Sequence, residues 1–437
     1  MGMIVKKNEM NNIKAIPTGY KQTEAGIIPE DWDVFLLGDV FDFKNGLNKG
    51  KEYFGVGTPI INYMDVYISG GVYSSFVQGK VLVTQEEKKN YSARKGDVFF
   101  TRTSETVEEI GLSSVLLDEI KDAVFSGFIL RGRQKTDVFV HSFMKYCFRA
   151  ENLRRQIKNT ASYTTRALTN GSMLSKVIAP APNKKEQSAI GKVLSDTDTL
   201  ITALEQLITK KKAIKTATMQ QLLTGRTRLP QFSKYHNGTL KNYKTSELGK
   251  IPKDWKINSV GDLFSISAGG DLRVDEFSDI KSELHPHPIY SNAISNFGLY
   301  GYCQSYDYIG DYLTITARGG IGHAVARKGS FCAIGRLLVL SPKGTSNVKF
   351  FEEYINQYLS FANESTGVPQ LTAPQAAKYL VNCPSIEEQT AIATILSDMD
   401  AELVTLEKKL AKVRDIKQGM MQQLLTGRIR LPLEQQP

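Results

Sequence analysis

The sequence predicts an α+β protein: two strand-rich α+β domains separated by two long α-helices that pair as an antiparallel coiled coil. Two internal repeats carry this prediction. The segments EQSAIGKVLSDTD and MQQLLTGRTRLP of residues 186–230 return as EQTAIATILSDMD and MQQLLTGRIRLP at 388–432. Likewise, GYKQTEAGIIPEDW from residue 19 returns as NYKTSELGKIPKDW from residue 242. A period above 200 residues indicates a duplicated module rather than a solenoid.

The number of residues between the two kinds of repeat differs between the two copies, whereas the repeats themselves stay closely similar. Gly225 and Gly427 lie 202 positions apart, whereas Trp32 and Trp255 lie 223 apart. The divergent parts are therefore the candidates for specificity. The predicted boundaries are 18–182 for the first domain, 183–240 for the central repeated helix, 241–384 for the second domain and 385–437 for the C-terminal repeated helix.

Each repeated helix has matching start and stop signals. Ser385 with Glu388 forms an S-x-x-E capping box, and Asn183 with Glu186 forms its Asn variant. Gly225 and Gly427 are the predicted C-terminal stops. From cap to stop is about 40 residues, or roughly 60 Å of helix.

Apolar residues in these helices recur at alternating steps of four and three, which is typical of a coiled-coil seam. We use "seam" for the predicted packing positions Ile190, Leu194, Thr197, Ile201, Leu204, Ile208, Lys211, Lys215, Thr218 and Leu222 of the first helix, and Ile392, Leu396, Met399, Leu403, Leu406, Leu410, Val413, Lys417, Met420 and Leu424 of the second. Two matched seams favour a pair, antiparallel in the expected arrangement, although chain length permits either direction. The alternative is two core helices of separate domains. Whether Lys211 and Lys215 fix the register or face solvent stays open.

Between the repeats the pattern changes to short alternating segments broken by Gly, Asn and Asp, which is typical of strands. Helical stretches follow the strands in each domain. The clearest predicted strands begin at Lys80 (KVLVT), Asp97 (DVFFTR), Asp311 (DYLTITAR) and Arg336 (RLLVLS), and the predicted helical stretches begin at His141 and Lys349.

One strand pattern occurs in both domains. A strand opened by Gly96 and Asp97 ends at Arg102, and one opened by Gly310 ends at Arg318. Both are predicted to deliver an arginine into the following loop. A guanidinium suits guanine O6 and N7, but a phosphate contact or a structural salt bridge are equally open roles.

A second polar loop precedes each long helix, TASYTTRALTNGS from Thr160 and NESTGVPQLTAP from Asn363. Such side chains suit hydrogen bonding to base edges, while an ordinary surface loop is the alternative. The candidate nucleic-acid contacts are Arg102, Thr103, Ser104, Tyr163, Thr164, Arg166 and Asn170 in the first domain, and Arg318, Gly319, His323, Gln370 and Thr372 in the second.

Composition favours an anionic partner. The net charge is +10 and the pI about 9.1, as suits phosphate binding. Four scattered cysteines without a C-x-x-C pair speak against a zinc site and a disulfide framework. A reducing cytoplasm is expected, because the sequence has neither an apolar run of membrane-spanning length nor a signal-peptide core.

Sequence signatures of catalysis are missing. The chain contains no [DNS]-P-P-[YF] run, no G-x-x-x-x-G-K-[ST] loop and no H-E-x-x-H motif. His285 and His287 stand beside prolines, so a loop is favoured over a metal-ligand pair. We expect a binding protein without catalysis, metal or cofactor of its own.

The paired EQxAIxxxLSDxD and MQQLLTGRxRLP segments, with the paired IPxDW motifs at Ile28 and Ile251, resemble the specificity subunit of type I restriction-modification systems. The resemblance implies two target recognition domains, each for one half of a split double-stranded DNA target. It also implies two modification subunits that methylate adenine with S-adenosylmethionine, and two restriction subunits that use ATP and Mg²⁺. No duplicated tetrapeptide stands between Leu200 and Lys215, which suggests an unexpanded spacer.

Two other functions remain possible at this point. The chain could serve another phage-defence methylation system with a related specificity subunit, or it could be a coiled-coil scaffold that binds proteins. The bases recognised, the spacer in base pairs and the methylated adenine do not follow from these residues.

Overall fold

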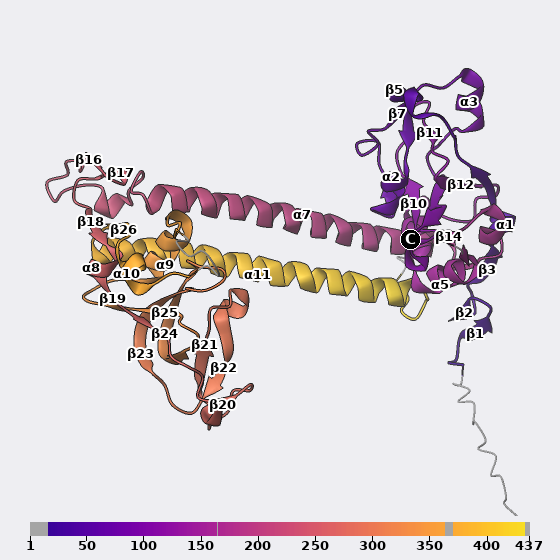
Figure 1. The fold of residues 1–437 in the computed structure, drawn as a ribbon. Helices are drawn as coiled ribbons and strands as arrows, with labels where there is room; N and C mark the ends of the chain where they lie inside the picture. The colour runs from indigo at the N-terminus through magenta and orange to yellow at the C-terminus, as the bar shows by residue number, and fades with distance from the viewer. Residues whose placement is uncertain (1–15, 164, 363–369, 433–437) are drawn as a thin grey trace, which may run out of the picture. The chain divides into compact units, whose positions relative to one another are not determined.

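The computed structural model describes residues 16–163, 165–362 and 370–432. The chain divides into two compact units, one made of the residues up to Leu204 with those from Lys409 onward, and the other of Glu205–Lys408. Each unit therefore holds one strand-rich domain, half of α7 (Lys184–Leu222) and half of α11 (Ile386–Leu424). Figure 1 shows both long helices and the strands. Among the described residues, no helix is long and apolar enough to cross a membrane.

The first unit follows the predicted order of strands and then helices, with short elements added. Its elements before α7 are β1 Tyr20–Thr23, β2 Gly26–Pro29, β3 Asp33–Leu36, α1 Leu37–Val40, β4 Phe41–Asn45, β5 Phe54–Ile61, α2 Tyr63–Tyr67, β6 Gly71–Val72, β7 Lys80–Val81, α3 Gln85–Asn90, β8 Val98–Thr101, β9 Thr103–Ser104, β10 Ser113–Leu116, β11 Val124–Phe125, β12 Ile129–Gln134, α4 His141–Cys147, α5 Glu151–Thr160, β13 Ser162–Tyr163, β14 Ala167–Leu168, α6 Gly171–Leu174 and β15 Ile178–Ala181.

The second unit repeats this plan with longer strands. Its elements before α11 are β16 Tyr243–Ser246, β17 Gly249–Pro252, β18 Lys256–Ser259, α8 Val260–Leu263, β19 Phe264–Ala268, β20 Phe277–Ser278, β21 His287–Tyr290, β22 Leu299–Cys303, β23 Tyr308–Ile315, β24 Ala324–Ala333, β25 Leu338–Pro342, α9 Val348–Tyr358, α10 Ala373–Ala377 and β26 Leu380–Cys383.

The main sheets of the two domains share their strand order. The first runs β4-β12-β8-β10-β6, and the second begins β19-β25-β23-β24 before it continues through β21, β22 and β20. In both, the third strand in this order has a fully buried run of apolar residues and threonine: Val98–Thr101 of β8 and Leu313–Ile315 of β23. The sequence repeats therefore flank a duplicated sheet, although the sheet sequences have diverged.

Two local predictions were too long. The segment KVLVT forms a strand only over Lys80–Val81, because Thr84 caps α3 and accepts a hydrogen bond from the Glu87 N–H at 3.1 Å. The helical stretch from His141 breaks into α4 and α5, with Ala150 in an extended conformation between them.

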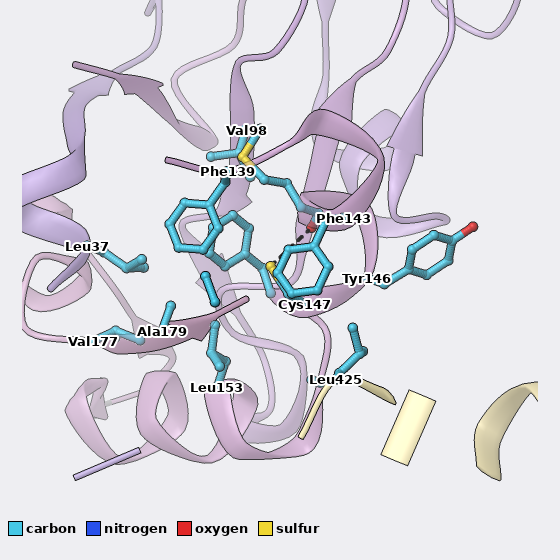
Figure 2. Packing of buried hydrophobic residues seen from close by; sticks show 14 of the residues in the cluster. Leu37, Val98, Phe139, Phe143, Tyr146, Cys147, Leu153, Val177, Ala179 and Leu425 are labelled. Atoms are coloured by element: carbon cyan, nitrogen blue, oxygen red, sulfur yellow. Dashed lines mark hydrogen bonds between the residues drawn. The ribbon is translucent and has the colours of Figure 1, made fainter. Parts of the chain in front are cut away.

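In each unit, residues from the predicted seams of the two long helices pack in one buried core. In the first, Ile190 and Leu194 of α7 share a buried core with Leu424 and Leu425 of α11. Figure 2 shows Leu425 beside this core, near Leu153. In the second, Leu222 of α7 lies in one core with residues of the opposite end of α11, Ile392 and Leu396. The start of one helix thus meets the end of the other, so the pair is antiparallel.

The lysines of the seam form ion pairs with the facing helix. Lys211 lies 2.8 Å from Glu402, and Lys215 lies 2.6 Å from Asp400. In the first unit Lys417 of α11 lies 2.6 Å from Asp198 of α7. The partners run in opposite directions along the two helices, as an antiparallel register requires. These lysines therefore bind the facing helix, which the sequence had left open.

The helix ends agree with the predicted signals except for one half of each capping box. Asn183 Oδ1 accepts from the Glu186 N–H at 3.0 Å, and Ser385 Oγ accepts from the Glu388 N–H at 3.4 Å. The reciprocal half was wrong, because each glutamate carboxylate binds an arginine instead.

Candidate nucleic-acid interface

In the first domain, the two polar segments that the sequence singled out come together. Strands β9, β14 and β13 form one three-stranded sheet, in which Thr103 pairs with Leu168 and Ser162 also pairs with Leu168. The Thr169 N–H donates to the Arg102 carbonyl at 3.0 Å. We call this assembly of residues 102–104 and 162–170 the first polar surface. Thr164 lies outside the described residues.

The second domain joins its two segments in the same way. Arg318 forms an antiparallel bridge with Gln370, and the Leu371 N–H donates to the Ala317 carbonyl at 2.9 Å. The loop of residues 317–322 is closed at its base, because the His323 N–H donates to Thr316 Oγ1 at 2.9 Å. We call residues 317–323 with 370–372 the second polar surface.

The hydrogen bonds also show how the two arginines are placed relative to equivalent positions of the two domains. Thr101 and Thr316 are equivalent, since each hydroxyl accepts from a backbone N–H across its loop at 2.9 Å. The carbonyl that joins the two segments belongs to Arg102 in one domain and to Ala317 in the other. Arg102 and Arg318 therefore occupy neighbouring positions, one residue apart, and not the same position.

Several predicted contacts are free to meet a ligand. Tyr163 is 58% exposed. Arg166 and its neighbour Glu105 stand 3.9 Å apart, with both side chains mostly in solvent, so this pair holds the arginine weakly. Arg318, Gly319 and Gln370 are exposed as well.

Other predicted contacts have a structural role. Ser104 is buried and its hydroxyl donates to Glu109 at 3.2 Å. Asn170 caps α6 through a 3.0 Å bond from the Met173 N–H, and Thr372 caps α10. Arg102 and His323 are partly exposed, and Arg102 Nη1 lies 3.5 Å from the Gly127 carbonyl. Caps and buried hydroxyls use the same residue types as base contacts, so composition alone could not separate them.

Sequence reasoning missed the role of the second arginine in each GRxRLP motif. In the second unit, Arg228 donates two hydrogen bonds of 2.7 Å to the buried Glu388 and further bonds to Asp254 of the IPxDW motif. Trp255 Nε1 also donates to Glu388, at 3.0 Å. We call this group the second clamp. It joins the helix end, the helix start and the domain start, which explains why these motifs persist together.

The first unit contains the matching first clamp. Arg430 donates to Glu186 at 2.6 Å and to Asp31 at 2.8 Å. The hydrogen bond from Arg430 holds the pKa of Asp31 below its usual range. The first clamp lacks one bond, since the buried Trp32 Nε1 has no partner. The arginine, glutamate and aspartate of both clamps belong to the repeated motifs and could be seen in the sequence. That these three side chains contact one another could not.

The helix-stop glycines belong to the same arrangement. Gly225 and Gly427 both have φ of +68°, which side chains disfavour. A Cβ on Gly225 would lie 2.6 Å from the Pro252 ring and 3.0 Å from the Trp255 ring. Each glycine is therefore needed both to end its helix and to let the IPxDW motif pack on it.

No group of three or more potential metal-ligating side chains occurs within the described ranges. His287 Nδ1 lies 2.7 Å from Ser330 Oγ, and His285 Nδ1 lies 3.3 Å from Ser282 Oγ. Both imidazoles are thus engaged by serines of their own domain.

Comparison with known proteins agrees with the duplicated plan. The family model described as "Type I restriction modification DNA specificity domain" matches twice, over residues 29–216 and 252–413. The type I restriction enzyme MjaVIII specificity subunit of Methanocaldococcus jannaschii is 23% identical and aligned over 94% of this chain and 96% of its own length.

Two solved structures have the same fold. The type I restriction-modification S subunit from M. genitalium matches with a TM-score of 0.56 and 17% identity, over 90% of this chain and 96% of that chain. A chain from a structure on complex assembly and conformational transition of the type I R-M system matches with a TM-score of 0.50 and 15% identity, over 92% and 99%. Since the family model covers well over half of the sequence in two copies, the chain belongs to the type I restriction-modification specificity subunits, non-catalytic DNA specificity subunits with two target recognition domains.

Proposed function

We propose that the first and second polar surfaces are the DNA-binding faces of the two recognition domains, each for one half of a bipartite double-stranded target. The proposed contacts are the exposed Tyr163 and Arg166 with the partly exposed Arg102 and Thr103 in the first domain, and the exposed Arg318 and Gln370 in the second. One observation carries this assignment. In both domains antiparallel backbone pairing brings together the two polar segments, although the domains have diverged in sequence.

The chemistry of these side chains suits DNA. Arginine can bind guanine O6 and N7 in a bidentate manner, Gln can bind adenine N6 and N7, and both also contact phosphates. The net charge of +10 favours association with the duplex. Ser104, Asn170 and Thr372 are proposed to hold the surfaces in shape rather than to contact bases.

The experiment starts from the methylation motif, found by single-molecule methylome sequencing of the host with and without this gene. Binding of the full-length chain, with its methyltransferase partner, is then measured on duplexes altered in either half-site. We expect Arg102→Ala to weaken recognition of one half-site by about 1–3 kcal/mol, and Arg318→Ala to do so at the other. Exposed Lys121 and Lys281 provide matched charge controls. Equal loss at every base would make these arginines phosphate contacts, and no loss would refute the assignment.

We further propose that the chain recruits two methyltransferase and two restriction subunits, and that S-adenosylmethionine, ATP and Mg²⁺ bind to those subunits and not to this chain. The two copies of the helical frame support this, because each copy offers an equivalent docking position. Cytoplasmic location is part of the same proposal, since the target is cellular DNA. Methyl transfer by the purified chain without partners would contradict it.

A further inference from the structure

Two β-turns lie at corresponding places in the two domains, at residues 126–129 and 334–337, and only in the second do both central residues have positive φ. In each turn the fourth N–H donates to the first carbonyl, at 3.1 Å and 3.2 Å. The second residue of each is a glycine, whose N–H donates to the chain just beyond β4 or β19, at 2.8 Å and 3.0 Å. The third residue is Phe128 in the first domain and Arg336 in the second. These two residues therefore occupy the same place in the duplicated fold.

Both residues are presented to solvent at a cost. Phe128 is 66% exposed, which leaves most of its ring without apolar contact. Arg336 is exposed and has a φ of +67°, a conformation that few residues other than glycine adopt. A residue other than glycine held at positive φ is often found at binding sites, and both side chains are open to a ligand.

Each turn is tied to the polar surface of its domain. The Arg102 N–H donates to the Phe128 carbonyl at 3.2 Å. In the second domain Asn292 makes the connection, because its Oδ1 accepts from the Ala317 N–H at 2.6 Å and its Nδ2 donates to the Gly335 carbonyl. Since Ala317 is the equivalent of Arg102, both turns lie beside the same edge of the surface.

We infer that Phe128 and Arg336 are equivalent base-contacting positions, one in each recognition domain, which act by apolar contact in the first and by hydrogen bonding in the second. This inference rests on the proposed DNA-binding surfaces. A phenyl ring suits the C5-methyl group of thymine, whereas a guanidinium suits guanine O6 and N7. The same backbone position would then select different bases in the two half-sites through the identity of one side chain.

The test measures binding of the full-length chain with its methyltransferase partner to a panel of duplexes, each with one base pair of the target changed. We expect Phe128→Ala to lower affinity for the cognate duplex about 10-fold and to remove discrimination at one position of the first half-site only. Arg336→Ala should do the same in the second half-site. Arg336→Lys should restore affinity but not discrimination, because an ammonium lacks the bidentate fork.

Matched controls come from the same domains. Phe76 is 64% exposed and packs on Tyr73, and Lys328 is an exposed cation of β24. Alanine at either should leave discrimination unchanged. Thermal unfolding of each variant checks folding, which the loss of an exposed side chain should not alter.

The outcomes separate this inference from the proposed function. If Arg102→Ala alters recognition and Phe128→Ala does not, the turn position is not a base contact but the polar surface stands. If neither alters recognition, the surface assignment fails as well. A loss from Arg336→Ala that is uniform across all duplexes and reversed by lysine would make Arg336 a phosphate contact and overturn its part of the inference.

Discussion

The second clamp allows a quantitative test, through the change Arg228→Met. The Arg228 side chain is 5% exposed and that of Glu388 is 3% exposed, so the pair is buried. Removal of the guanidinium deletes both of its bonds to Glu388 and leaves a carboxylate in a site closed to water. We expect the free energy of unfolding of this unit to fall for that reason.

The expected magnitude follows from burial. Breaking a buried ion pair by removal of one partner costs about 3–5 kcal/mol. Trp255 Nε1 still donates to Glu388, which places the loss near the lower end, at about 3 kcal/mol. Arg430→Met should destabilise the first unit as well, because it would leave the carboxylate of Glu186, 1% exposed, buried without its arginine.

The chain offers a specific probe for each clamp. Trp32 and Trp255 are its two tryptophans, one in each unit. Trp32→Phe removes the other fluorophore from the first unit; because it shrinks a fully buried side chain, Arg228→Met is compared with the Trp32→Phe chain as its reference. Urea unfolding followed by Trp255 fluorescence then reports on the second clamp. With a urea dependence of about 2 kcal/mol per molar, a loss of about 3 kcal/mol moves the midpoint down by about 1.5 M.

A double variant provides the control. Glu388→Gln in the Arg228→Met background removes the buried charge and should recover part of the loss, because a neutral amide is cheaper to bury than a carboxylate. A midpoint shift below about 0.3 M for Arg228→Met, or no recovery in the double variant, would show that the clamp does not hold the unit together.

Three further outcomes are expected. Leu403→Ser with Leu406→Ser should lower stability by about 2–5 kcal/mol and change the permitted gap between half-sites in the methylome, because Leu403 is buried in the seam; unchanged stability and methylation would refute the seam. Lowering the pH below about 4 should destabilise the chain. Burial raises the pKa of Asp198, but hydrogen bonds from lysines outweigh burial and hold the folded-state pKa below the unfolded value. The stability that Asp198 contributes is therefore present above the unfolded pKa and is lost as the pH falls through the folded one. A urea midpoint that stays constant from pH 6 to about pH 3 would contradict this. DNA affinity should fall at least about 100-fold between about 50 and about 200 mM salt, and a flat salt dependence would favour the protein-binding scaffold.

Much of the frame was predictable because it depends on local or periodic signals. The seam follows from the spacing of apolar residues, and the helix ends follow from Asn183, Ser385 and the two stop glycines. Each of these signals depends only on residues a few positions away in the sequence. The domain boundaries at 18–182 and 241–384 stay predictions.

The exact place of each arginine in its sheet was not predictable from the sequence. Arg102 and Arg318 both follow a strand that begins with glycine and aspartate, but this pattern does not give their register. Strand register is set by hydrogen bonds between chain segments, here the bonds that Thr101 and Thr316 accept from the far sides of their loops. A linear comparison cannot detect a shift of one residue in that register.

The sequence by itself determined the duplication, the two helices and the family, because repeats and heptads are written in the order of residues. The tertiary structure decided the direction of the helix pair within each unit, the arginine clamps and the composition of each polar surface. All of these join residues distant in sequence, as Arg430 joins Glu186 and Asp31. Such contacts depend on how the chain folds back on itself, and local patterns carry no record of that.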